Sequence, residues 1–164
     1  MSNHYSENDA VISDCGKYRY LLRRVWDHTK PRALLIMLNP STADARQDDA
    51  TIRSCVRLLG GLGYGSTEVV NLMAWRATDP KDLPPKPSDA MGSDNPRTIE
   101  AAIHRCDVAI CAWGAHPYAE RFKGAVLDMI SLYRPVAYCF GKTKAGAPKH
   151  PLYIKSGTPL ETYR

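Results

Sequence analysis

Polar residues that could do chemistry stand directly after apolar runs of this sequence. Asn39 follows the run ALLIML, Asn71 follows VV, His116 comes shortly after VAICA, and Lys142 comes after VAYCF. An asparagine amide can hold a water or a polar substrate group, and a histidine can move a proton or donate to a developing anion. Groups of these types at strand ends predict a site that binds and reacts with a polar ligand.

Acidic residues close to the first of these clusters are candidates for a general base. Asp44 and Asp49 lie a few residues beyond Asn39, and a carboxylate there could activate a water. Asp49 is equally suited to cap a helix, which is a purely structural role. His150 lies between two prolines, on a stiff segment after the last apolar run. The candidate catalytic residues are Asn39, Asp44, Asp49 and His150.

Other side chains near the strand ends could bind a ligand. The hydroxyls of Ser41 and Thr42 suit a phosphate, although the same residues often form turns. Asn71 could read the edge of a nucleobase, or be satisfied by neighbouring backbone. A tryptophan there could stack on a base or only complete the core. The candidate binding residues are Ser41, Thr42, Asn71, Arg76, Trp113, His116 and Lys142.

The elements that would position these groups are strands that alternate with amphipathic helices. Apolar runs at 33–38, 69–70, 108–112 and 136–140 predict buried parallel strands, and helices are expected at 49–59, 95–105 and 118–133. Prolines between 80 and 87 predict an extended loop without regular structure. We expect one α/β domain over 1–164, with an N-terminal β-hairpin at about 9–27 and a core at about 33–154. Its architecture would be a three-layer α/β/α sandwich around a four-stranded, mainly parallel sheet, with the ligand beyond the carboxyl ends of the strands.

Composition limits the partners and cofactors that we expect. Five cysteines form no CxxC pair and no metal-ligand spacing, so no metal or other cofactor is predicted. The polar N-terminus lacks the features of a signal peptide, and no apolar stretch could span a membrane, which favours a cytoplasmic protein. A net charge of +5 is compatible with DNA or a nucleotide ligand, and is also common in proteins that bind neither. Oligomeric state is left open.

The stretches YRYLLRRVW, LNPSTAD with DDATIRSC, VVNLMAWRATDP and FGKTKAGAPKHPLYI resemble the uncharacterised DUF1643 family over most of the chain. A more distant resemblance is to the uracil-DNA glycosylase superfamily, through LNPS, the asparagine of VVN and the HP pair. That resemblance implies that Asn39 positions the attacking water, Asn71 reads the base, and His150 stabilises the departing base. Ser41 stands where the asparagine-type motif usually has glycine.

Together these features predict an enzyme that hydrolyses an N-glycosidic bond, in the manner of a DNA glycosylase acting on a flipped-out base. Two alternatives stay open. One is an enzyme that modifies the base of a free nucleotide or nucleoside. The other is a non-catalytic module that binds nucleic acid or a protein partner. Fold alone does not choose among these functions.

Overall fold

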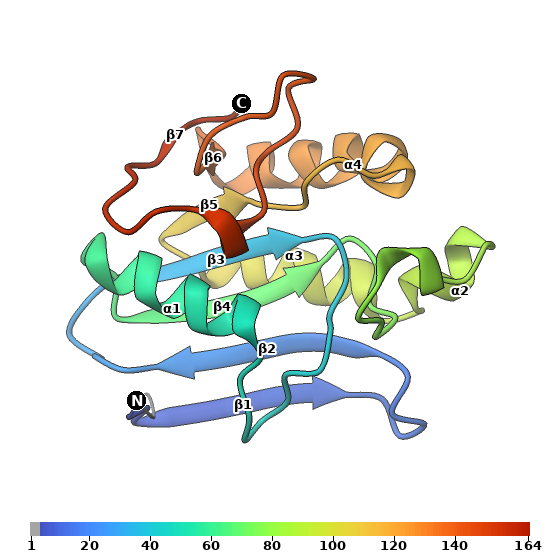
Figure 1. Cartoon of the computed structure of the whole chain (residues 1–164), viewed down its shortest axis with the longest axis horizontal. Helices are drawn as coiled ribbons and strands as arrows, with labels where there is room; N and C mark the ends of the chain where they lie inside the picture. The colour runs from blue at the N-terminus through green and yellow to red at the C-terminus, as the bar shows by residue number, and fades with distance from the viewer. Residues whose placement is uncertain (1–3) are drawn as a thin grey trace.

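The computed structural model describes residues 4–164, which form a seven-stranded mixed sheet with the strand order β1-β2-β4-β3-β5-β6-β7 (Figure 1). The strands are β1 (Glu7–Ile12), β2 (Arg19–Val25), β3 (Arg32–Met37), β4 (Ser66–Asn71), β5 (Val108–Cys111), β6 (Tyr138–Cys139) and β7 (Glu161–Thr162). The helices are α1 (Ala50–Gly61), α2 (Pro87–Met91), α3 (Asn95–Arg105) and α4 (Pro117–Tyr133), with short 3-10 turns η1 (Pro80–Asp82) and η2 (Pro151–Tyr153).

The expected four-stranded, mainly parallel sheet is wrong. The neighbours β4, β3, β5 and β6 are parallel, but β1 and β2 pair antiparallel at one side and β7 pairs antiparallel with β6 at the other. The N-terminal hairpin is therefore part of the sheet and does not merely flank it. Its second strand joins β4 through Leu22–Val25, which pair with Ser66–Val69. The three arginines of β2 make its sequence resemble a half-exposed strand, yet Arg19 and Arg24 are buried.

Helices cover both faces of this sheet. Side chains alternate along β3, so that Leu34 and Ile36 face one cluster and Leu35 and Met37 face the other. The first cluster is closed by α3 and α4, and the second by α1. Figure 1 shows α1 in front of the sheet and α3 behind it. The three layers follow from strands that are apolar on both faces.

Local signals explain where the helices begin. The Asp49 side chain accepts a hydrogen bond from the backbone N–H of Ile52 and caps α1. The loop after β4 was expected to lack regular structure. This is wrong, because the loop contains η1 and α2, and each of them begins with a proline. A proline fits the first turn of a helix, where no N–H partner is needed.

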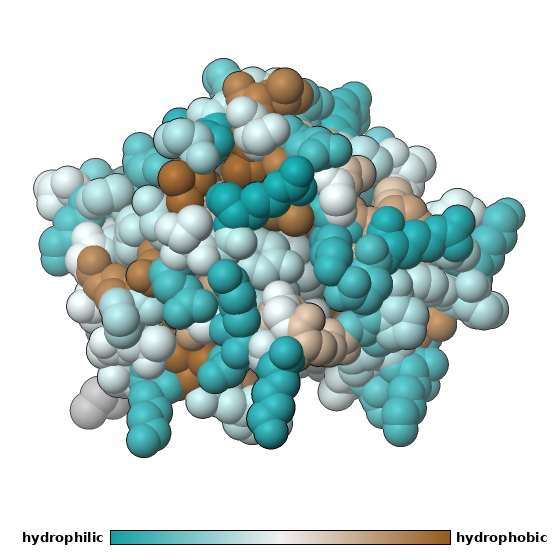
Figure 2. Space-filling model, turned by 90° about the horizontal axis from the view of Figure 1, so that it is seen from above, coloured by the Kyte–Doolittle hydropathy of each residue, from teal (hydrophilic) through white to brown (hydrophobic). Residues whose placement is uncertain are grey.

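The face of the molecule that Figure 2 shows is mainly hydrophilic. Figure 2 looks onto the side of the C-terminal segments, where small separate hydrophobic patches lie among long polar side chains. No helix within residues 4–164 has the length and apolar character needed to cross a membrane.

Candidate functional site

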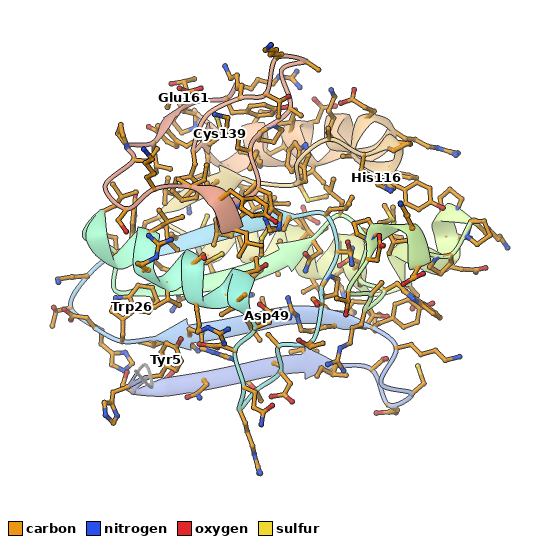
Figure 3. The ribbon with its side chains drawn as sticks, in the orientation of Figure 1. Tyr5, Trp26, Asp49, His116, Cys139 and Glu161 are labelled. Carbon is orange, nitrogen blue, oxygen red and sulfur yellow. The ribbon has the colours of Figure 1, made fainter. Side chains whose placement is uncertain are left out.

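A cavity of about 610 Å³ opens where β3 and β5 end, and we call it the edge pocket. Its walls come from the segments that follow β3, β4 and β5, from the start of α1 and from the turn η2. Figure 3 shows Asp49 at the beginning of α1 and His116 at the beginning of α4, on the side toward which β3 and β4 run. The pocket therefore lies at the carboxyl edge of the parallel strands, where ligands of open α/β sheets bind.

Asp49 is held rigidly in the edge pocket by backbone donors. Its Oδ1 accepts from the N–H of Ile52 at 2.9 Å, and its Oδ2 accepts from the N–H of Ala43 at 3.2 Å. The Asp49 charge also acts on Arg19 and His150, since it opposes the fall that burial causes in both of their pKa values. A carboxylate has further lone pairs beyond two bonds, so Asp49 can still accept a proton or orient a water.

Two histidines line the same pocket, and each caps the turn or helix that follows it. Nδ1 of His150 accepts the N–H of Leu152 at 3.2 Å, and Nδ1 of His116 accepts the N–H of Tyr118 at 3.1 Å. A neutral ring whose Nδ1 accepts must carry its proton on Nε2. Burial lowers the pKa of His150, which keeps that ring neutral at pH 7. The neutral His150 ring therefore has an Nε2–H donor that the cap interaction does not use.

Asn39 has a fixed orientation as well. Its Nδ2 donates to the carbonyl of Ala77 at 2.7 Å and to that of Pro40 at 3.1 Å. These bonds assign the amide nitrogen to the loop and leave Oδ1 as an acceptor for a water or a ligand. The residue thus joins the segment after β3 to the loop after β4.

The edge pocket brings together most of the candidate residues from separate parts of the chain. Those that line it are Asn39, Ser41, Thr42, Asp49, Trp113, His116 and His150. Trp113 is only 2% exposed and its ring packs edge-on against Tyr163, while its buried indole N–H has no hydrogen-bond partner among the described residues.

Four candidate residues lie outside the edge pocket: Asp44, Asn71, Arg76 and Lys142. Asp44 accepts two backbone N–H bonds within its own turn, which lower its pKa and give it a structural role. Asn71 is buried, and its side-chain amide has no hydrogen-bond partner among the described residues. Arg76 lines a neighbouring groove, and Lys142 is exposed beyond β6.

Arg19 is the main pocket residue that the sequence did not indicate. Val11 pairs with Leu21 while Ile12 pairs with Arg19, so Tyr20 is an extra residue of a β-bulge. A bulge changes the direction of the side chains beside it, and here Arg19 lines the edge pocket at 1% exposure. Its Nη1 donates to the carbonyl of Ala43 at 3.0 Å, whereas its Nε has no partner within residues 4–164. Burial lowers the Arg19 pKa to about 10.

Tyr153 was missed too, and it lies at the mouth of the pocket with 87% of its surface exposed. No periodic signal marks such a residue, because it sits in a turn of three residues. For a metal ion, residues 4–164 offer no group of three or more His, Cys, Asp or Glu side chains placed to share one.

The fold and the edge pocket together define an α/β protein with a polar ligand site at the carboxyl edge of a mixed sheet. Neither a curated protein nor a solved structure matches the chain. The family DUF1643, described as a protein of unknown function, matches residues 19–152, and the chain belongs to this family. The match begins at Arg19 and covers every residue that lines the pocket except Tyr153. None of these comparisons returned a uracil-DNA glycosylase, so that resemblance contributes only to what is proposed below.

Proposed function

We propose that this protein hydrolyses an N-glycosidic bond, with the nucleobase of its substrate held in the edge pocket. The observation that carries the proposal is the state of His150: its Nδ1 is occupied by the Leu152 N–H, and burial keeps the ring neutral. The Nε2–H is then a fixed donor for the negative charge that develops on a departing base. A preorganised donor of this kind is worth about 3–4 kcal/mol in an active site.

The reacting water would bind between Asn39 and Asp49, which both line the pocket. Oδ1 of Asn39 accepts a hydrogen bond from the hydrogen that the water keeps, and the Asp49 carboxylate takes the other proton as the water oxygen bonds to the anomeric carbon. The bond from that carbon to the base nitrogen breaks, and the base leaves as an anion that is hydrogen-bonded by His150. The proton held by Asp49 is finally passed to solvent or to the released base, which restores the carboxylate.

The positions of Asn71 and Asp44 change which residues this mechanism uses. Since Asn71 does not line the pocket, recognition of the base falls to side chains that do, above all Arg19 and His116. Since Asp44 is bound within its own turn, Asp49 is the general base. An arginine that keeps an unused donor can hydrogen-bond a base carbonyl.

A basic groove beside the pocket supports a polynucleotide substrate. This groove, of about 370 Å³, shares Ser41 and Thr42 with the edge pocket and is lined also by Lys17, Trp75 and Arg76. The Lys17 ammonium lies 5.7 Å from the Trp75 ring centre, next to the partly buried Arg76. Cations and aromatic rings in one groove are suited to backbone phosphates and neighbouring bases of a single strand.

A free nucleotide is the second candidate substrate, because the same groove could hold its one phosphate. Binding of a polynucleotide and binding of a free nucleotide differ in their salt dependence. A polynucleotide releases several counterions and loses affinity steeply as the salt concentration rises. A mononucleotide contacts few cations and depends weakly on salt. Binding measured between about 50 and 200 mM salt separates them.

The direct test is alkali cleavage of labelled oligonucleotides that carry uracil, hypoxanthine, 5-hydroxymethyluracil, mismatched thymine or normal bases, in single and double strands. His150→Asn is the informative variant, because asparagine can still cap η2 while it removes the Nε2–H. His104→Asn, at an exposed histidine outside the pocket, is the matched control. We expect abasic sites from wild type and control, and a loss of about 100-fold or more in His150→Asn. Folded wild-type protein that releases no base from any strand or nucleotide would overturn the proposal.

A further inference from the structure

A second polar hollow lies at the opposite edge of the sheet from the edge pocket, and we call it the basic hollow. Its volume is about 240 Å³. Arg32 and Ser66 are the first residues of β3 and β4, and Asp107 directly precedes β5, so the hollow lies at the amino-terminal edge of the parallel strands. Four of the lining side chains are cationic, namely Arg23, Lys30, Arg32 and Arg105, and the others are Val25, His28, Ser66 and Asp107.

One buried carboxylate organises these cations. Glu68 is 3% exposed, and its Oε2 lies 2.8 Å from Nη2 of Arg105 while its Oε1 lies 3.5 Å from Nη1 of Arg32. Two guanidinium groups thus share a single negative charge. Arg23 lies opposite Glu68 in the pairing of β2 with β4, but its guanidinium forms an ion pair with the half-exposed Glu7 at 3.3 Å. Arg23 and Lys30 pair with the carboxylates of Glu7 and Asp27, so Arg32 and Arg105 are the cations that share one carboxylate.

The guanidinium groups also keep unused donors. Nε of Arg23 and Nε of Arg32 are both buried, and neither has a hydrogen-bond partner within residues 4–164. A buried N–H without a partner costs free energy, so its presence beside a polar hollow indicates a bound acceptor. An oxyanion would supply acceptor oxygens to these unpartnered donors.

We propose that the basic hollow is a phosphate-binding site, separate from the edge pocket and independent of the function proposed for that pocket. Arginine groups in fixed positions match the geometry of a phosphate group better than that of a monovalent halide. Among the described residues no Phe, Tyr or Trp lines the hollow, so it is better suited to the phosphate than to a base. The phosphate could belong to a small phosphorylated molecule or to a nucleic-acid backbone.

Titration calorimetry with inorganic phosphate, a nucleoside monophosphate and a short single-stranded oligonucleotide tests this site at matched ionic strength. The variant Arg23→Gln with Lys30→Gln removes two lining cations that do not contact Glu68. Lys86→Gln with Lys155→Gln, at exposed lysines outside the hollow, is the matched control. We expect affinity to fall about tenfold for each cation removed and to be unchanged in the control. Binding of free phosphate assigns the site to small molecules, and binding of the oligonucleotide alone assigns it to a nucleic-acid backbone.

A second variant gives a change of the opposite sign. Glu68→Gln removes the carboxylate that competes with the ligand for Arg32 and Arg105, so phosphate should bind more tightly and raise the unfolding temperature more than in wild type. If Glu68→Gln is unfolded without phosphate, refolding on addition of phosphate would likewise show that phosphate binds the folded protein. Affinities that are equal in the double variant and its control, for every ligand, would overturn the proposal.

Discussion

Two fully buried arginines on β2 should respond in opposite directions to the same substitution. Arg24 is saturated: its Nε donates to Asp48 at 2.8 Å, and its other nitrogens donate to backbone carbonyls that include those of Arg23 and Asp44. Arg19 has one bond, to the Ala43 carbonyl, and an Nε without a partner among the described residues. We predict that Arg24→Met destabilises the fold strongly and that Arg19→Met stabilises it.

The magnitudes follow from burial and bonding. Burial lowers the Arg19 pKa from 12.5 to about 10, which corresponds to a penalty of about 3 kcal/mol for holding the charge there. Loss of the bond to Ala43 costs about 1–2 kcal/mol, so Arg19→Met should raise the free energy of unfolding by about 1–2 kcal/mol. Arg24→Met leaves a partly buried Asp48 without its cation and should lower that free energy by about 3–5 kcal/mol.

Urea unfolding of the two variants and wild type at pH 7 measures both changes, with the slope of the transition as a check on two-state behaviour. At pH 7 the free-energy penalty for burying the Arg19 charge is fully present, because it is relieved only as pH rises through the lowered pKa of Arg19, about 10. The same Arg19→Met variant should lose ligand binding in the edge pocket, which is the pattern of a residue kept for function at a cost in stability. Equal destabilisation by both substitutions would show that the Arg19 charge is compensated in the fold, and would remove it from the proposed site.

Three further outcomes are expected. Because burial lowers the pKa of His150, the unfolded chain binds more protons just below pH 6.5, so stability should rise with pH in that range; urea unfolding from pH 5 to 8 should show this slope in wild type and not in His150→Asn. His116→Ala should cost about 1 kcal/mol as a lost α4 cap, whereas His116→Asn should cost little by thermal unfolding. Gly65→Ala should cost about 3 kcal/mol in the same assay, because its Cβ would lie 2.0 Å from the Asp27 carbonyl oxygen.

The parts of the fold that sequence could predict are those with strong local signals. The helices at 50–61, 95–105 and 117–133 carry a cap or a proline at their start and an apolar stripe, and their observed bounds lie close to the expected ones. The central strands are apolar on both faces, which only a covered parallel sheet explains. Since polar residues that end parallel strands must meet at one edge, the gathering of Asn39, His116 and His150 in one pocket followed from that pattern.

The parts that could not be predicted depend on contacts distant in sequence. β2 carries arginines that ordinarily mark a solvent-facing strand, and only Asp48 and Asp44, far along the chain, allow Arg24 to be buried. A bulge at Tyr20 redirects the Arg19 side chain, and no residue type in β2 predicts that bulge. β7 has two residues, too few for any periodic pattern. Asn71 is the last residue of β4 and does not line the edge pocket, so the expectation that it reads a ligand stays a prediction.

Three N-cap residues of this protein also line the edge pocket, so a structural role and the proposed chemical role would fall on the same side chains. Asp49 begins α1, His116 begins α4 and His150 begins η2, and all three line the edge pocket. A cap needs one acceptor atom per side chain, which leaves the second carboxylate lone pairs or the Nε2–H for a ligand. Capping also fixes each side chain before a ligand binds, so these side chains lose little conformational entropy on binding. Because α1 and α4 both direct their N-terminal ends at the pocket, their dipoles favour negative charge there, as a departing base or a phosphate would require.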